Sequence, residues 1–357
     1  MMKNWKRIFL LVLVLSLVIM MSIGCQKPVV EDDPENDPGK VEEPEKIVVT
    51  DVTGRELTFD QPATKVVGTH NPSLNAVVVL GGGDKYIVGF GNKEMSRHLY
   101  ESVINDFDGL PQIGKGKNIN LETVASTGAN LAVIPERFKD QVEEYEGVGV
   151  TGIVALPNVE SFDTVKNTMK ILGKVLGEDA RAANIVEFFD QKIADAKEIS
   201  SKATEKQKVL FLGGSSPLSV APSAMIQTEL IEAAGGINAV EGIDAKGDFA
   251  DVNIEEIIGW NPDVIWLPAY ADYTVDELIN DPAWASINAI KNKAVYNFPS
   301  ILEPWDQPTA AVALGVSWAT HSLHPELHSL DDLKKDADDF YNLVYGKTFT
   351  LEEMGLK

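Results

Sequence analysis

The chain of 357 residues contains a single cysteine, Cys25. One cysteine cannot form an internal disulfide, and a lone thiol gives little support to redox chemistry. Basic residues are also scarce, because 31 Lys and Arg stand against 54 Asp and Glu, a formal net charge of −23. A surface of that sign repels nucleic acid and anionic lipid headgroups, so we expect neither as a partner.

Several sequence patterns of enzymes are missing as well. Neither GxxxxGK(S/T) nor GxGxxG, the glycine-rich patterns that cradle phosphates, is present. Ser215 and Ser216 follow an apolar run and two glycines, but the esterase pattern GxSxG is absent. We therefore expect no catalytic residues. A secreted esterase remains the alternative from the enzyme class, and turnover in an esterase assay would support it.

The five histidines do not make a convincing site for a bare metal ion. Three of them are spaced at i, i+3 and i+7: His321, His324 and His328. Pro325 should end the helix there, so the three rings are not expected to share a face. His70 and His98 lack the third histidine that zinc and manganese binders of related architecture use. We expect no metal site and no cofactor.

The first 24 residues have the anatomy of a signal peptide. Positive charges precede an apolar run of 14 residues, Ile8 to Met21, which is short for a membrane span of about 20 residues. Ser22-Ile23-Gly24-Cys25 then resembles a lipobox, although serine replaces the commoner leucine. We expect cleavage before Cys25, lipidation of that residue and an extracytoplasmic, membrane-anchored protein. Cleavage would remove three positive charges and take the net charge from −23 to −26.

The segment that follows Cys25 is predicted to be a disordered acidic tether. Gln26 to Lys46 holds eight acidic residues and four prolines with almost nothing apolar. Such a composition cannot bury enough surface to fold. A flexible coil of this length reaches roughly 25 Å, enough to hold a domain just above a membrane.

From Ile47 onward, short apolar runs alternate with segments of helical pattern, which predicts an α/β fold with mainly parallel sheets. Asn71-Pro72 is typical of a helix start, and that helix should end at the glycines 81–83. The runs expected to form buried strands are 66–69, 87–90, 131–134, 153–156, 209–212 and 264–267.

Two proline-free amphipathic helices are predicted in the middle of the chain, over Phe162 to Leu176 and Asp179 to Ala203. Strand–helix alternation restarts at Val209, so we interpret the second helix as a bridge between two Rossmann-like lobes. The predicted divisions are an N-terminal lobe over 47–160, a helical segment over 161–203 and a C-terminal lobe over 204–357.

An internal repeat supports the two lobes. Asn120-Leu121-Glu122, followed by a run ending at Pro135, matches Asn253-Ile254-Glu255, followed by a run ending at Pro268, at a constant offset of 133 residues. In each copy an Asn should cap a short helix, and a Glu lies in its first turn, where the helix dipole favours negative charge. A chance match of generic α/β patterns is the alternative.

Ligands of open α/β sheets lie beyond the carboxyl ends of the strands, so loops from the two lobes should line one shared cleft. The first-lobe loops carry potentially positive groups, and the second-lobe loops are aromatic and polar. That combination suits a bulky ligand with anionic groups and a flat or apolar surface, such as a metal chelate. The predicted ligand-binding residues are His70, Asn71, Asn92, Lys93, Arg97, Arg137, Ser215, Tyr270 and Trp305.

Several ordered motifs resemble those of ABC-importer substrate-binding proteins of the iron-complex and vitamin B12 type. They are Thr50 to Phe59, Val66 to Leu74, Gly82 to Gly89, Asn120-Leu121-Glu122, Asn261 to Ile265 and Ala313 to Glu326. The resemblance implies two lobes joined by one long helix, as in class III periplasmic-binding-protein folds, with little domain closure. It also implies that Glu122 and Glu255 each face a basic socket on the permease.

We therefore predict a monomeric solute-binding lipoprotein that delivers its ligand to an ABC permease. A ferric siderophore is the first candidate ligand, followed by haem or a corrinoid. A small oxyanion such as molybdate or tungstate is the alternative, because His70, Lys93 and Arg137 could suit it. Ligand identity does not follow from the fold, because one fold hosts many ligands through loop variation.

Overall fold

The computed structural model describes residues 45–243, 245 and 247–356. The predicted signal peptide, Cys25 and nearly all of the predicted tether therefore lie outside the described residues. From Glu45 onward the chain forms one compact unit. Within the described ranges, no helix combines the length and apolar character needed to cross a bilayer.

The N-terminal sheet has four parallel strands in the order β4-β3-β7-β8. Parallel neighbours require crossover connections, and these put helices on the faces of the sheet. Its strands are β3 (Val66–Gly68), β4 (Ile87–Phe90), β7 (Leu131–Pro135) and β8 (Thr151–Leu156). Antiparallel pairs flank it: β1 (Ile47–Thr50) with β2 (Glu56–Phe59), and β5 (Gly114–Lys115) with β6 (Asn118–Ile119). The helices are α2 (Asn71–Gly81), α3 (Arg97–Val103), η2 (Phe107–Gly109), α4 (Leu121–Thr127), η3 (Glu136–Gln141) and α5 (Val142–Glu146).

The C-terminal sheet is also four-stranded and parallel, in the order β11-β9-β13-β14. Its strands are β9 (Lys208–Phe211), β11 (Ile237–Asn238), β13 (Val264–Pro268) and β14 (Val295–Phe298). A short antiparallel pair joins β10 (Ser219–Val220) to β12 (Ala250–Asp251). The helices are α8 (Ile226–Ala233), α9 (Ile254–Trp260), α10 (Val275–Asn280), α11 (Asn288–Lys291), α12 (Val312–Leu323), α13 (Leu330–Tyr345) and α14 (Leu351–Met354). We call each sheet with its covering helices a lobe.

The repeat at an offset of 133 residues corresponds to equivalent structure in the two lobes. Helices α4 and α9, and strands β7 and β13, begin and end at matching positions of the repeat. Asn120 accepts a hydrogen bond from the backbone N–H of Thr123, and Asn253 accepts one from Glu256, at 3.0 and 2.9 Å. Both asparagines therefore cap their helices as predicted, and the predicted α/β fold with parallel sheets is confirmed.

Two consecutive helices, α6 (Phe162–Leu176) and α7 (Asp179–Ser200), connect the lobes. A capping box between Ser161 and Thr164 starts α6, and Gly177, with φ of +70°, ends it. The prediction continued α7 to Ala203, but the helix ends three residues earlier. The hydroxyls of Ser200 and Ser201 bond back to carbonyls of the preceding turn, and such bonds compete with helix continuation.

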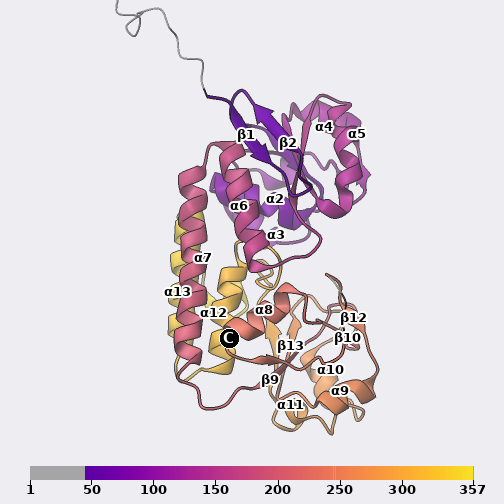
Figure 1. Ribbon diagram of the computed structural model, residues 1–357, viewed down its shortest axis with the longest axis vertical. Coiled ribbons are helices and arrows are strands. Elements are labelled where there is room, and N and C mark those ends of the chain that lie inside the picture. The colour runs from indigo at the N-terminus through magenta and orange to yellow at the C-terminus, as the bar shows by residue number, and fades with distance from the viewer. Residues whose placement is uncertain (1–44, 244, 246, 357) are drawn as a thin grey trace, which may run out of the picture. The chain divides into compact units, whose positions relative to one another are not determined.

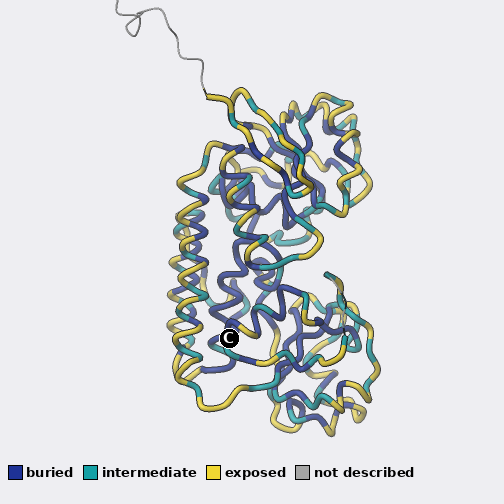
Figure 2. The backbone as a smooth tube through the Cα atoms, viewed as in Figure 1, coloured by how far each residue is buried: buried dark blue, intermediate teal, exposed yellow. Residues whose placement is uncertain are grey.

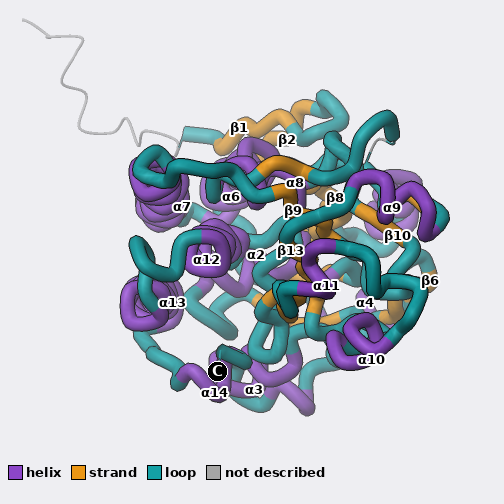
Figure 3. The backbone as a smooth tube through the Cα atoms, turned by 90° about the horizontal axis from the view of Figure 1, so that it is seen from below, coloured by secondary structure: helices purple, strands orange, loops and turns teal. Residues whose placement is uncertain are grey.

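The long helix α7 that bridges the lobes is packed into a bundle. Helix α7 packs against α6, α12 and α13 (Figures 1 and 3). One face of α7 is buried and its opposite face is exposed (Figure 2). A single apolar cluster runs from the N-terminal sheet, through Leu172 and Phe189, to Trp266 and Phe340. This cluster therefore joins the cores of the two lobes, and each lobe also has a cluster of its own.

Candidate functional site

The carboxyl ends of the parallel strands carry the chemically distinctive side chains. In the N-terminal lobe His70 follows β3, Arg137 follows β7 and Glu160 follows β8. In the C-terminal lobe Tyr270 follows β13 and Asp306 follows β14. Carboxyl ends of parallel strands meet at one sheet edge, where such folds bind ligands. The facing-loop cluster, as we define it, comprises His70, Arg137, Phe138, Glu160, Asp248, Tyr270, Asp306 and Gln307.

His70 and Arg137 form a hydrogen-bonded pair. Arg137 Nη2 donates to His70 Nε2 at 2.8 Å. A guanidinium has only donors, so Nε2 is the unprotonated ring nitrogen, and Nδ1–H donates to Ser73 Oγ at 2.9 Å. Burial, with the charge of Arg137, lowers the pKa of His70 to about 3. His70 is therefore a neutral orienting group, and the positive charge of the pair belongs to Arg137.

Glu160 is the acidic partner of Arg137. Its Oε1 lies 3.6 Å from Arg137 Nη2, and its side chain is 23% exposed against 50% for Arg137. Burial raises the pKa of the Glu160 carboxyl to about 7; the Arg137 charge lowers it, and Asp248 in the C-terminal lobe raises it further. This carboxyl can gain or lose its proton near neutral pH.

Tyr270 presents its ring rather than its hydroxyl. The residue is 45% exposed, yet its O–H donates to Asp306 Oδ2 at 2.9 Å and accepts from Gln307 Nε2 at 3.0 Å. Burial raises the pKa of Asp306 to about 6, and Asp306 in turn helps to raise the pKa of Tyr270. The ring lies against Gly214, where an added Cβ would approach it to 3.1 Å. Tyr270 thus offers a fixed, flat aromatic face.

The two halves of the cluster meet at one point of backbone contact. Gly247, with φ of +80°, lies so close to the carbonyl of Asn158 that a Cβ there would be 2.9 Å away. The charge of the neighbouring Asp248 raises the pKa of Glu160, and the charge of Glu160 raises the pKa of Tyr270. Residues from both lobes therefore surround Glu160.

Two predicted ligand-binding cations are engaged inside the N-terminal lobe. Lys93 Nζ donates to the carbonyls of Phe107 and Asp108, both at 2.9 Å. Arg97 makes ion pairs within its own neighbourhood, to Glu94, Glu101 and Asp108. The structure does not bring either cation to Arg137.

Four further predicted residues have other surroundings. Asn71 is 7% exposed and bonds to Tyr100 and Ser96 inside the lobe. Trp305 is 1% exposed, and its Nε1 donates to Tyr341 Oη at 3.0 Å, so it belongs to the core. Asn92 is half-buried and caps its own loop, whereas Ser215 is exposed in the loop beside Tyr270.

The three C-terminal histidines make hydrogen bonds within the protein. Helix α12 ends at Leu323, before Pro325, as predicted. Each ring has its own partner: His321 donates to the carbonyl of His328, His324 bonds to the carbonyl of Ala234, and His328 bonds to Ser317. Among the described residues, no group of three or more His, Cys, Asp or Glu side chains is placed to hold a metal ion.

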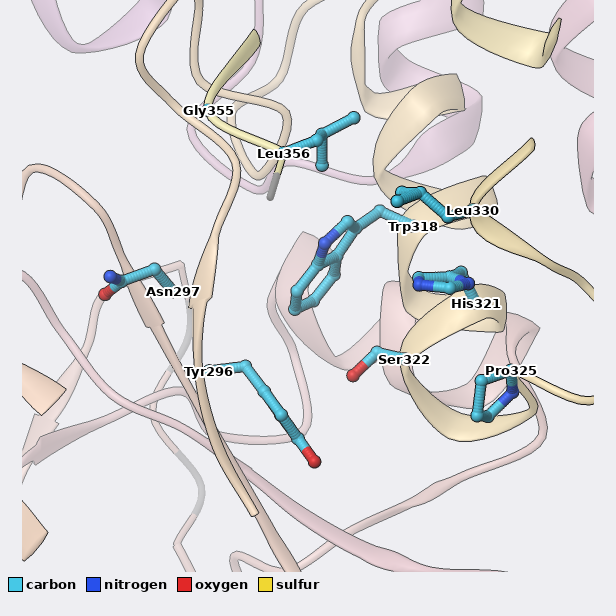
Figure 4. Close-up of a pocket in the computed structure, with 9 residues that line it drawn as sticks. All are labelled: Tyr296, Asn297, Trp318, His321, Ser322, Pro325, Leu330, Gly355 and Leu356. Carbon is cyan, nitrogen blue, oxygen red and sulfur yellow. The ribbon is translucent and has the colours of Figure 1, made fainter. Parts of the chain in front are cut away.

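A cavity of about 430 Å³ lies elsewhere in the C-terminal lobe, between β14, α12 and the C-terminal segment (Figure 4). Ser322 in its wall accepts a hydrogen bond from Trp266 Nε1, so part of its polar lining is used by the core. None of the predicted ligand-binding residues lines this cavity. Its lining residues are Tyr296, Asn297, Trp318, His321, Ser322, Pro325, Leu330, Gly355 and Leu356.

The two residues predicted to dock a permease are both exposed. Glu122 lies in the first turn of α4, and Glu255 lies in the first turn of α9. Their helices occupy equivalent positions in the two lobes. The structure thus presents two matching surface carboxylates, one per lobe.

Sequence reasoning missed Glu160. It follows a buried strand and precedes the N-cap Ser161, so its position at the sheet edge could have been found by following every strand to its end. Asp306 and Gln307 directly follow Trp305, the residue predicted for this loop. Their role depends on a contact with Tyr270, which no local pattern shows.

Comparisons with known proteins agree with this architecture. The family described as periplasmic binding protein matches residues 66–302. The molybdate-binding protein MolA of Haemophilus influenzae is 24% identical over 331 residues, covering 85% of this chain and 92% of that protein. The Fe(3+)-citrate-binding protein YfmC of Bacillus subtilis is 24% identical over 287 residues, covering 80% and 87%. A solved periplasmic solute binding protein from Veillonella parvula gives a TM-score of 0.74 at 24% identity, covering 87% of this chain and 96% of that one.

Proposed function

Because the chain belongs to the periplasmic binding protein family, whose members bind substrates for ABC importers and are not enzymes, we propose that it captures an anionic metal chelate. The ligand proposed first is a ferric siderophore or a related ferric chelate, with haem or a corrinoid next. The observation that carries this proposal is the presence, in the facing-loop cluster, of both Arg137 and the flat face of Tyr270, each within the influence of Glu160.

Arg137 and Tyr270 together suit a chelate that has both anionic oxygen donors and an apolar or planar surface. Arg137 is half exposed and keeps donors beyond those used by His70, so it can bind carboxylate or other oxygen donors. The ring of Tyr270 can pack on an apolar or planar part of the ligand. The relative named for Fe(3+)-citrate supports an oxygen-rich ferric complex.

A small oxyanion is the second candidate. With Lys93 and Arg97 engaged elsewhere, Arg137 is the predicted ligand-binding cation that lies in the facing-loop cluster. One guanidinium matches a compact anion as well as it matches a larger chelate. The relative named for molybdate binding favours testing this class beside the first.

We also propose how the protein delivers its ligand to the permease. Lipidation at Cys25 would hold the protein at the membrane, and Glu122 and Glu255 would each enter a basic socket of the permease. Two carboxylates, one on each lobe, would fix the orientation of docking. We propose that the protein acts as a monomer, with lobes over 47–160 and 204–357 that each supply one wall of the site.

A ligand panel tests the proposal. Purified protein would be titrated with ferric citrate, ferric hydroxamate and catecholate siderophores, haem, cobalamin, molybdate and tungstate, with tryptophan fluorescence and melting temperature as readouts. A ligand at 100 times its Kd stabilises the folded state by about 2.7 kcal/mol, which raises the melting temperature measurably. Saturable binding by one class identifies the ligand. Absence of quenching and of any thermal shift across the panel would remove the support for a chelate or oxyanion.

A further inference from the structure

We propose that Glu160 is the internal counter-ion of Arg137, and that an anionic ligand binds by displacing this carboxylate, which takes up a proton as the ligand enters. This inference rests on the proposed function and adds a residue that selects for anions. It also makes the affinity of the site dependent on pH.

The geometry begins with Arg137. Its guanidinium donates to the neutral ring of His70 at 2.8 Å and faces the Glu160 carboxylate at 3.6 Å. The first contact is a full hydrogen bond, and the second is a longer ion pair. His70 therefore orients the guanidinium, while Glu160 balances its charge without holding it tightly. An incoming carboxylate or oxyanion can make the short, charge-assisted bonds that Glu160 does not make.

The surrounding backbone holds Glu160 beside Arg137. Glu160 directly precedes Ser161, whose capping box starts the 15-residue helix α6. The N–H of Asn158 donates to Glu136 Oε2 at 2.9 Å, which ties this loop to the η3 segment that carries Arg137. Arg137 and Glu160 therefore lie at the ends of two neighbouring elements, η3 and α6, whose backbone positions keep the two side chains close together.

Glu160 is surrounded by groups of both signs of charge. Arg137 approaches from η3, with the neutral His70 behind it at the start of α2. From the C-terminal lobe, Asp248 and Tyr270 face it, and the hydroxyl of Tyr270 is already bonded to Asp306. Glu160 thus faces one guanidinium and is also within the electrostatic influence of a second carboxylate, Asp248. A ligand anion added to this group is repelled unless one of the carboxylates becomes neutral.

Of the two carboxylates, Glu160 is the one whose surroundings favour the neutral, protonated form. Its pKa is raised to about 7, chiefly by burial, while the neighbouring Arg137 still lowers it. A ligand anion that takes over Arg137 removes that lowering influence and adds a second negative charge. The pKa of Glu160 must then rise further, so a proton moves from solvent to its carboxyl oxygen. The protonated group can donate a hydrogen bond to the bound anion.

Calorimetry with molybdate and with ferric citrate tests the proposal. Each titration would be run at pH 7.5 in two buffers of different ionisation enthalpy, which counts protons taken up per ligand bound. For the wild type we expect uptake approaching one proton, and an affinity that weakens several-fold or more between pH 6.5 and 8.5. Glu160→Gln should abolish the uptake, flatten the pH dependence and bind about tenfold more tightly at pH 8.5. Glu143→Gln, a change at an exposed site on α5, should behave as the wild type does.

Weaker binding by Glu160→Gln, or unchanged proton uptake, would overturn the proposal. If neither probe binds, molybdate and ferric citrate are excluded as ligands, and the state of Glu160 is decided separately. Carbon-13 NMR of the ligand-free protein would follow the carboxyl signal that disappears in Glu160→Gln. A titration near neutral pH that moves upward in Arg137→Gln supports the counter-ion role. A titration at the ordinary value for glutamate, or one that Arg137→Gln leaves unchanged, refutes it.

Discussion

At the scale of single residues, the partner of each cation decides its role. Lys93, Arg97 and Arg137 all follow strands of the same sheet. Lys93 is occupied by two carbonyls and Arg97 by three carboxylates, whereas Arg137 is bonded to a neutral ring and lies at an ion-pair distance from a carboxyl of raised pKa. Of the three, Arg137 is the one whose contacts are to members of the facing-loop cluster, His70 and Glu160.

Arg137→Gln should therefore weaken ligand binding much more than Lys93→Gln. A hydrogen bond to a charged group contributes about 1.5–3 kcal/mol, so loss of the guanidinium should raise the Kd at least tenfold. Lys93→Gln removes bonds that lie inside the lobe, so its Kd should stay within about twofold of the wild-type value. Fluorescence titration with the ligand found in the panel measures both. Equal losses in the two variants would contradict the assignment of Arg137.

The sequence was sufficient to place His70, Arg137 and Tyr270 at strand ends, because parallel strands and their loops follow from apolar periodicity. It could not distinguish Arg137 from Lys93, since the carbonyls that occupy Lys93 come from a turn 14 and 15 residues away. The surroundings of Trp305 could not be predicted for a similar reason. Its strand-end position is right, but its indole bonds to Tyr341 in a helix that only tertiary packing brings there.

At the scale of elements, α4 and α9 are equivalent helices with exposed first-turn glutamates. Glu122→Lys combined with Glu255→Lys should abolish ligand uptake by cells and leave the Kd of the purified protein within about twofold. The reason is that like charges would face the basic sockets, while the ligand site is untouched. Glu143→Lys with Glu232→Lys, two other exposed glutamates, is the matched control and should retain uptake. Unimpaired uptake in the first double variant would refute the docking role.

Helix ends allow a paired test of backbone conformation. Gly177 ends α6 with φ of +70°, whereas Gly259 lies within α9 and has no atom within 4 Å of an added Cβ. Gly177→Ala should lower the free energy of unfolding by about 1–2 kcal/mol, because an L-residue is strained in the left-handed region. Gly259→Ala should raise it by about 0.5–1 kcal/mol. Urea denaturation measures both, and shifts of the same sign would contradict this explanation.

Most elements of the fold could be predicted from periodicity and caps. Helix α6 runs from Phe162 to Leu176 as predicted, because a capping serine and a terminal glycine mark both ends. The bundle of α7 with α12 and α13 could not be predicted. Helix α12 is buried on all sides and so has no polar face to show which neighbours it takes.

At the scale of the whole molecule, the shared core limits how far the lobes can move independently. The apolar cluster continues through the helices of the bundle, and polar contacts cross with it. Asn75 Nδ2 of α2 donates to Glu303 Oε2 in the loop after β14, at 3.3 Å, and Tyr341 of α13 bonds to the same carboxyl. Breaking these contacts would expose a buried carboxyl and apolar surface together, so small rearrangements of the loops are favoured over wide closure.

Glu303 also makes the stability of the molecule depend on pH. The residue is 2% exposed, and burial raises its pKa to about 7. In the unfolded chain it ionises at an ordinary glutamate value, so between these two values the folded state binds more protons, and stability falls as pH rises. From pH 6 to pH 8 this one group should lower the free energy of unfolding by about 1 kcal/mol. Glu303→Gln cannot ionise and should lose that part of the pH dependence, whereas the exposed Glu143→Gln should keep it. Urea denaturation at both pH values measures the difference, and equal slopes for Glu303→Gln and the wild type would show that Glu303 does not ionise in this range.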